Sequence, residues 1–163
     1  MNQKEIILEQ LSAMGFDPIE LGNVGYAFKY EELNYLYMPD DNDEQFLRIA
    51  VPQLYDVTDE NRVAVLEAMH DTGVMIKYSK VCIMCDDAVW AIYEHRFSTC
   101  EDLAEILEHI IRVLEATAQV FHKKINGEDV IFDSEDAEDM SDEQLEAELQ
   151  RLLQSIDDED ISN

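Results

Sequence analysis

The stretch Val74–His122 constrains the fold most, because it predicts a β-hairpin that leads directly into a long amphipathic helix. The first arm, Val74–Cys85, is rich in β-branched and sulfur-containing apolar residues, two aspartates supply the turn, and the second arm is Ala88–Glu94. Over Cys100–His122, apolar residues recur every three or four positions, which is typical of a helix that buries one face. A sheet packed against this helix is therefore expected.

The residues before the hairpin predict a helix, three strands and a second helix. These elements are a helix over Lys4–Met14, strands over Tyr26–Tyr30, Leu33–Met38 and Phe46–Val51, and a helix over Asp59–Asp71. Pro52 is expected to close the third strand and Gly73 the second helix, whose apolar stripe is Val63, Leu66 and Met69, widened by Val65. Because the connections are too short for crossovers, the strands are predicted to be antiparallel. The fold class is α+β, with a five-stranded antiparallel sheet in the order α-β-β-β-α-β-β-α and helices packed on it.

The second arm of the hairpin is apolar on both faces. Trp90 and Ile92 point to one side of the strand, while Val89, Ala91 and Tyr93 point to the other. A sheet covered by helices on one side only is expected to show polar residues on its second face. Either helices cover both sides, or the second face meets another chain, and the C-terminal helix and a twin subunit are both candidates for that cover. The candidate partner-binding residues are Trp90, Ile92, Val89, Tyr93, Ile83, Leu149 and Leu152.

The composition changes at residue 126, which divides the chain into a domain over 1–125 and an acidic extension over 126–163. The extension holds 15 acidic side chains and one arginine. Its apolar residues recur at spacings of four, three and four, which predicts an amphipathic helix over about 141–156. This helix is expected to pack on its own domain, with pairing to a neighbouring chain or a loose position on an acidic tether as the alternatives. The apolar residues of the helix are Leu145, Leu149, Leu152 and Ile156.

The net charge limits the classes of partner. With 38 acidic and 11 basic residues, the chain has a formal net charge of −27. Such a chain is repelled by nucleic acid backbones and by anionic membranes, and it favours basic protein partners. No apolar run is long enough to span a membrane. Three cysteines form no disulfide framework, which favours a reducing compartment, so we expect a cytoplasmic protein.

The order of the predicted elements carries a resemblance to a known family. The aromatic strand Val89–Tyr93 leads through Phe97-Ser98-Thr99 into the leucine- and isoleucine-rich helix Leu103–Phe121. With the earlier helices and strands, residues Lys4–Lys123 resemble the type III secretion chaperone-like fold, and most of all the YbjN-type family of bacterial sensory transduction regulators. The resemblance implies a small, acidic, usually dimeric protein that binds other proteins, often holding them unfolded or inactive. It implies no catalytic residues, and the acidic extension after Lys123 departs from the pattern.

The motifs that suggest chemistry each lack a required part. Cys82 and Cys85 form a C-x-x-C within a predicted strand, whereas a redox pair needs a helix N-terminus and a zinc site needs two more ligands, so we expect buried core cysteines. The run Asp40–Glu44 resembles the start of a calcium loop, but Gln45 and Val51 stand where an EF-hand needs glycine and glutamate. The four histidines are expected at the surface. No nucleophile motif or phosphate-binding loop is present, and we expect no enzyme, metal or cofactor.

The sequence therefore predicts a non-enzymatic protein-binding module, chaperone-like or regulatory, that holds a partner on an apolar surface of the sheet and helices. The expected form is a homodimer through the long helix or the sheet. The alternative is an acidic regulator that mimics nucleic acid and occupies the basic groove of a DNA-binding protein. The two hypotheses differ in salt dependence, because mimicry weakens steeply with salt and apolar binding does not.

Overall fold

The computed structural model describes residues 2–130, 146–147 and 149–154 of the chain. It contains two compact units, Met1–Val130 and Ile131–Asn163. In the second unit, the described residues are helical and exposed, while Leu145 and Ile156 of the predicted helix lie outside the described residues. The first unit contains all the named elements. In chain order, these are α1 (Gln3–Ala13), β1 (Ile19–Leu21), β2 (Gly25–Tyr30), β3 (Leu33–Tyr37), β4 (Phe46–Asp56), α2 (Arg62–Met75), β5 (Ser79–Ile83), β6 (Ala88–Arg96) and α3 (Leu103–Ile125).

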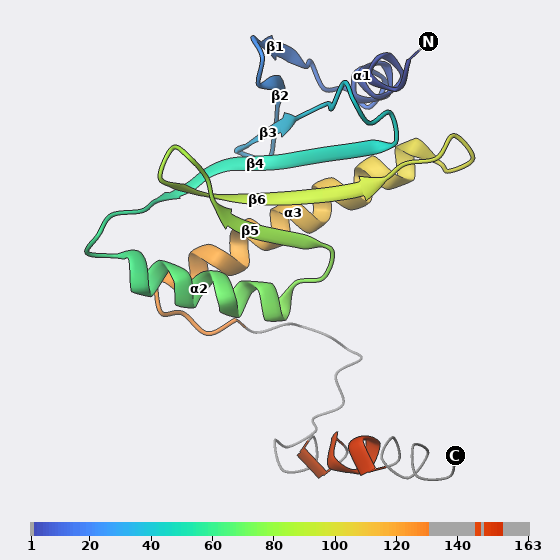
Figure 1. The fold of residues 1–163 in the computed structure, drawn as a ribbon. Helices are drawn as coiled ribbons and strands as arrows, with labels where there is room; N and C mark the ends of the chain where they lie inside the picture. Colours follow the sequence, from blue (N-terminus) through green and yellow to red (C-terminus); the bar gives the residue numbers. More distant parts are fainter. Residues whose placement is uncertain (1, 131–145, 148, 155–163) are drawn as a thin grey trace. The chain divides into compact units, whose positions relative to one another are not determined.

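The strands form one antiparallel sheet in the order β1-β2-β3-β4-β6-β5 (Figure 1). The α+β class is confirmed, but the sheet has six strands, not five. The additional strand is β1, which pairs with β2 through Ile19–Ala27 and Leu21–Gly25. Three residues are too few to show a period of two, so the alternation that reveals longer strands could not reveal this one.

The expectation that Pro52 closes a strand is wrong, because β4 continues to Asp56. The pairing of β4 with β6 shifts between Val51 and Tyr55, and Gln53 in this segment has a φ of 54°. Such an irregularity is the place where a strand tolerates proline, because the missing N–H is not needed for the ladder.

The expected boundaries and apolar stripe of α2 are also wrong. The helix continues through Gly73 to Met75, so β5 begins at Ser79 and not at Val74. Its buried residues are Val65, Ala68 and Thr72, whereas Val63 and Leu66 of the expected stripe are exposed and Met69 is half-buried. Thr72 can be buried because its hydroxyl donates to the carbonyl oxygen of Ala68 at 2.7 Å.

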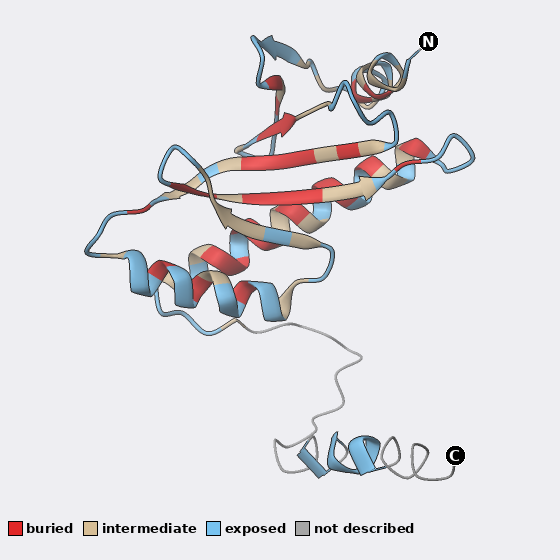
Figure 2. Ribbon diagram, in the orientation of Figure 1, coloured by how far each residue is buried: buried red, intermediate tan, exposed pale blue. Residues whose placement is uncertain are grey.

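The long helix α3 buries the face that its periodicity predicts. Nine of its residues are buried, among them Leu107, Ile110 and Leu114. Buried and exposed positions alternate along the helix (Figure 2). The helix begins at Leu103 and not at Cys100, because Asp102 is the N-cap and its side chain accepts from the backbone N–H of Glu105 at 3.2 Å.

All three helices of the first unit pack on the same face of the sheet. One core cluster joins Ile7 and Leu11 of α1 to Phe28 of β2, Ile49 of β4 and Leu114 of α3. A second cluster joins α2 to the other end of the sheet and of α3. Its members are Val57, Val65, Ala68, Val89 and Phe121. Among the described helices, none has an apolar run long enough to cross a membrane.

Candidate protein-binding surface

The face of the sheet opposite the helices carries no helix in residues 2–130, and we call it the open sheet face. The strand register defines it by one row of side chains that crosses all six strands. This row is Ile19, Ala27, Leu36, Ala50, Ile92 and Lys80. The residues two positions away along each strand lie on the same face. They include Arg48 and Glu94 on one side of the row, and Trp90 on the other.

The middle of this row is buried although no helix of residues 2–130 covers it. Leu36 is 3% exposed, Ala50 0% and Ile92 4%. A charged network lies beside them, in which Oε1 of Glu94 accepts from Nη2 of Arg48 and from Nζ of Lys80, each at 2.9 Å. Long charged side chains cover apolar surface with their methylene groups while their charged ends remain in water. This arrangement explains how the hairpin can be apolar on both faces although all helices of residues 2–130 lie on one face of the sheet.

Glu94 is the centre of this network. Its carboxylate is half-buried, and burial alone raises the pKa, but the hydrogen bonds and charges of Lys80 and Arg48 outweigh burial and hold the pKa of Glu94 below its ordinary value. The guanidinium of Arg48 also lies over the ring of Phe46, 4.8 Å from the ring centroid. The charged network is therefore an ordered part of the open sheet face at neutral pH.

Trp90 lies on the open sheet face near the β5–β6 turn. Its Nε1 donates to Oδ2 of Asp86 at 3.1 Å, and the same oxygen accepts from Gln53 at 3.3 Å. The small burial of Asp86 raises its pKa, but the hydrogen bonds from Trp90, Gln53 and the backbone outweigh burial and lower it. The indole is half-buried and held at one end, which leaves an aromatic surface available beside the charged network.

The structure separates the residues that the sequence singled out. Trp90 and Ile92 lie on the open sheet face, but Val89, Tyr93 and Ile83 point toward the helices. Val89 is fully buried, and the hydroxyl of Tyr93 lies 3.2 Å from Nδ1 of His109 on α3. The remaining two candidates belong to the second unit, where Leu149 and Leu152 are exposed by 51% and 58%.

The cations of the open sheet face were missed by the sequence analysis. By strand register, Arg48, Lys80 and Arg96 lie on the same face as Ile92 and Trp90. We call these three cations the cationic patch. The available signal was their alternation with core residues along the strands, which places every second residue on one face.

The outer side of α2 is a second exposed apolar surface. Val63 is 70% exposed and Val74 73%, and Leu66 lies between them along the helix. After this helix, Tyr78 has a φ of 74° and stacks on Tyr93 with ring centroids 6.2 Å apart. The left-handed backbone at Tyr78 is an uncommon conformation for an aromatic residue. The α2 surface is distinct from the open sheet face because the helix packs on the opposite side of the sheet.

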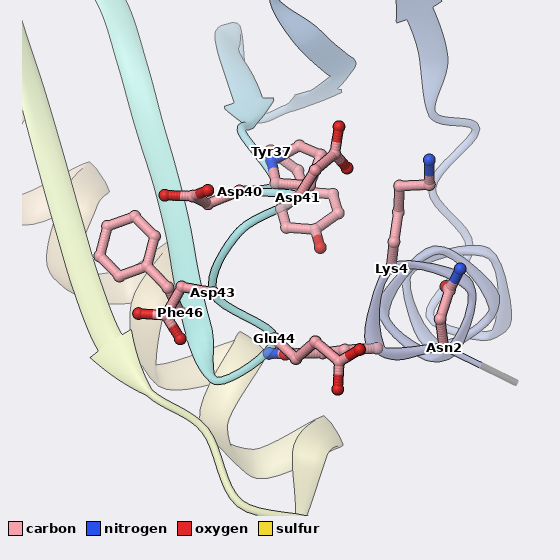
Figure 3. A pocket seen from close by; sticks show the side chains of 10 residues that line it. Asn2, Lys4, Tyr37, Asp40, Asp41, Asp43, Glu44 and Phe46 are labelled. Atoms are coloured by element: carbon pink, nitrogen blue, oxygen red, sulfur yellow. The ribbon is translucent and has the colours of Figure 1, made fainter.

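A small hollow of about 110 Å³ lies between the start of α1 and the β3–β4 loop, and carboxylates surround it (Figure 3). The carboxylates of Asp41, Asp43 and Glu44 point apart and not toward one position. Asp40 and Asp43 accept hydrogen bonds from the backbone N–H groups of residues 42 and 45, so they shape the loop. Among the described residues, no three His, Cys, Asp or Glu side chains are grouped to hold a metal ion.

The cysteines and two histidines differ from their expected environments. Cys82 is half-buried on the open sheet face, but Cys85 is exposed in the turn, so the expectation of two buried core cysteines is wrong. His95 is half-buried with Nε2 3.1 Å from Oε1 of Glu101, and His122 is half-buried with Nε2 2.9 Å from the carbonyl oxygen of Leu54. These residues are not grouped, and the cysteines are free.

The comparisons with known proteins show the fold. The chain is similar to the crystal structure of YbjN, a protein from E. coli proposed to be a transcription regulator, with a TM-score of 0.54 and 8% sequence identity. The similarity covers 76% of this chain and 92% of the YbjN chain. No family model matches the sequence, and no curated protein matches it. The chain therefore has a YbjN-like fold, as its order of elements predicted.

Proposed function

We propose that the chain is a non-enzymatic protein-binding module, regulatory or chaperone-like, which holds a partner protein on the open sheet face around Trp90. The observation that carries this proposal is the one-sided packing of the sheet, because all three helices of residues 2–130 lie on one face. The second face presents a fixed indole and an ordered charged network on rigid strands. Aromatic and arginine side chains are the residues that most often contribute strongly to protein interfaces.

The fold supports the same proposal. A YbjN-like fold fits a regulatory or binding role, and YbjN itself is proposed to be a regulator. The described residues supply no grouped metal ligands. We place the protein in the cytoplasm, in agreement with its three free cysteines.

A Trp90→Glu substitution in the full chain tests the surface. Capture of partner proteins by this variant is compared with capture by the unaltered chain and by Lys123→Glu, which places a negative charge at the exposed end of α3, away from the open sheet face. We expect the partner to be lost from Trp90→Glu and retained by Lys123→Glu. Urea denaturation of each variant shows whether it is folded. A folded Trp90→Glu variant that retains the partner would show that the binding surface lies elsewhere.

The acidic nucleic-acid mimic is the second candidate, and the net charge of −27 favours it. The test is binding of a DNA-binding protein with a basic groove at increasing salt. Mimicry predicts a steep loss of affinity between about 50 and 200 mM salt, because the contacts are ionic. Binding through Trp90 predicts a shallower dependence and sensitivity to Trp90→Glu. A mimic must use surfaces other than the cationic patch.

We also propose that the chain forms a homodimer through the outer side of α2. The apolar side of α3 is used within its own core, so the long helix is a poor dimer surface. Antiparallel pairing of two α2 helices about a twofold axis brings Val63 of one copy against Val74 of the other, and Glu67 against His70. Light scattering after size exclusion tests this proposal. We expect a dimer for the full chain and a monomer for Val63→Glu, with Ile19→Glu as the control on the opposite face.

A further inference from the structure

We propose that the open sheet face recognises an acidic, leucine-bearing segment of a partner protein. The inference rests on the proposed function, because it names the chemistry of the partner for the same surface. It differs from what the net charge predicts, since a chain with 38 acidic residues favours a basic partner over most of its surface. The cationic patch makes the open sheet face an exception to that rule.

The cationic patch concentrates positive charge on the β4, β6 and β5 strands. Arg48, Lys80 and Arg96 lie there with one carboxylate among them, that of Glu94. The other acidic groups near the face lie at its ends. They are Asp56 at the end of β4, Asp86 in the β5–β6 turn, and Asp43 and Glu44 before β4. The patch therefore has a net positive charge in a chain whose formal net charge is −27.

The patch also has hydrogen-bond donors that its one carboxylate does not use. A single oxygen of Glu94 accepts from Nε and Nη2 of Arg48, at 3.1 and 2.9 Å, and from Lys80. A guanidinium carries five N–H groups and an ammonium three, so the bonds to Glu94 use fewer than half of the donors of Arg48 and Lys80. The side chains of Arg48 and Lys80 are 34% and 51% exposed. A second carboxylate can bind these donors without breaking the bonds to Glu94, and arginine suits such a contact because its donors are planar and paired.

Apolar surface on the open sheet face is the reason that we expect leucines beside the acidic residues of the partner segment. The indole of Trp90 is half-buried beside Lys80, and β1 at the far edge exposes Ile19 by 62% and Leu21 by 48%. A helix with leucines on one side and carboxylates beside them places its leucines on the indole and its carboxylates on the cations. Residues 141–156 of this chain have the same chemistry, and a peptide of that sequence is a suitable probe.

The test is a titration that follows Trp90, the only tryptophan of the chain, by fluorescence. The protein is the full chain carrying Leu149→Asp and Leu153→Asp, which replace two exposed leucines of its own acidic segment, so that the intact segment is supplied only by the added 141–156 peptide. We expect saturable binding that Lys80→Glu weakens by about tenfold, whereas Lys123→Glu, at the end of α3, leaves it unchanged. A tenfold change corresponds to about 1.4 kcal/mol, which suits one desolvated charge contact.

The control peptide has each glutamate and aspartate replaced by lysine. Binding of the lysine peptide in preference to the acidic peptide would overturn the proposal, and so would no binding of the acidic peptide. Neither result affects the proposed function if Trp90→Glu still loses its natural partner, so the two failures can be told apart. If the altered chain binds the peptide and the unaltered chain does not, the chain's own acidic segment already occupies the open sheet face. That result would overturn the proposal that the segment belongs to a partner protein.

Discussion

Replacement of Glu94 by glutamine tests whether the charged network on the open sheet face stabilises the fold. The substitution keeps the size of the side chain and removes its charge. Exposed ion pairs contribute about 0.2–1 kcal/mol each, and Glu94 forms two, with Arg48 and with Lys80. Glutamine still accepts one hydrogen bond, but the two cations are left as like charges on strands that flank β6. We therefore expect Glu94→Gln to lower the free energy of unfolding by about 1–2 kcal/mol.

Urea denaturation followed by the fluorescence of Trp90 measures this difference within the first unit. The pKa of Glu94 in the folded state lies below its ordinary value of 4.5. The stabilisation is therefore complete above pH 4.5 and is lost as the pH falls through the lower folded-state pKa. The difference between the two proteins is expected to be constant near neutral pH and to shrink below pH 4.5. It is also expected to shrink at about 1 M salt, where charges are screened over about 3 Å.

Glu108→Gln is the matched control. It removes a carboxylate that pairs with Arg112 on the outer surface of α3, where the two side chains are 56% and 74% exposed. This pair is expected to contribute about 0.3–0.5 kcal/mol at most. Equal effects of Glu94→Gln and Glu108→Gln would refute the reasoning, and so would a Glu94→Gln effect that salt does not change.

Three further predictions concern the core and its tyrosines. Leu114→Ala, at a fully buried position of α3, is expected to cost about 2–5 kcal/mol by urea denaturation, whereas Val24→Ala, at an exposed position between β1 and β2, is expected to change stability by less than about 0.5 kcal/mol. Gly25→Ala is expected to cost at least about 2 kcal/mol in the same assay, because φ is +147° and the added Cβ overlaps the carbonyl oxygen of Tyr37. Burial, followed by the nearby acidic residues and tyrosines, raises the pKa values of Tyr35 and Tyr37 well above 10. Stability is therefore expected to fall as the pH rises above 10, and ultraviolet absorbance is expected to show these two tyrosines ionising only as the chain unfolds.

The elements with long, one-sided patterns could be predicted from the sequence. The periodicity of α3 extends over many turns, so only one face can be apolar, and the structure buries that face. The pattern of α2 is ambiguous, because Val63 and Leu66 define one apolar side while Val65 and Ala68 define another. The structure buries the side with the smaller residues, since these allow closer packing against β5 and α3. Which side of α2 is buried therefore depends on the neighbouring elements and cannot be predicted from the sequence of the helix alone.

The candidate surface could be predicted only in part, for a similar reason. Alternation along β6 correctly separates Trp90 and Ile92 from Val89 and Tyr93. It does not show which of these faces the helices cover. Alternation along one strand also cannot show that side chains from the neighbouring strands cover Ile92. Arg48 and Lys80 lie 32 residues apart in the sequence, and only the strand order brings them together. The cationic patch is therefore a property of the assembled sheet.

The same glutamate links stability to recognition, and the two are expected to change in opposite directions. Glu94 uses donors of Arg48 and Lys80 that an acidic partner would otherwise find free, so its loss destabilises the sheet but increases the positive charge of the open sheet face. We therefore expect Glu94→Gln to lower the stability of the fold and to increase the affinity for the acidic 141–156 peptide by about threefold to tenfold, as one uncompensated charge contact predicts. The titration with Trp90 fluorescence measures that affinity, and urea denaturation of the same protein measures the stability. If Glu94→Gln lowers both the stability and the peptide affinity, Glu94 holds Arg48 and Lys80 in the geometry that the partner needs. Its role would then be to position the two cations and not to compete with the partner for them.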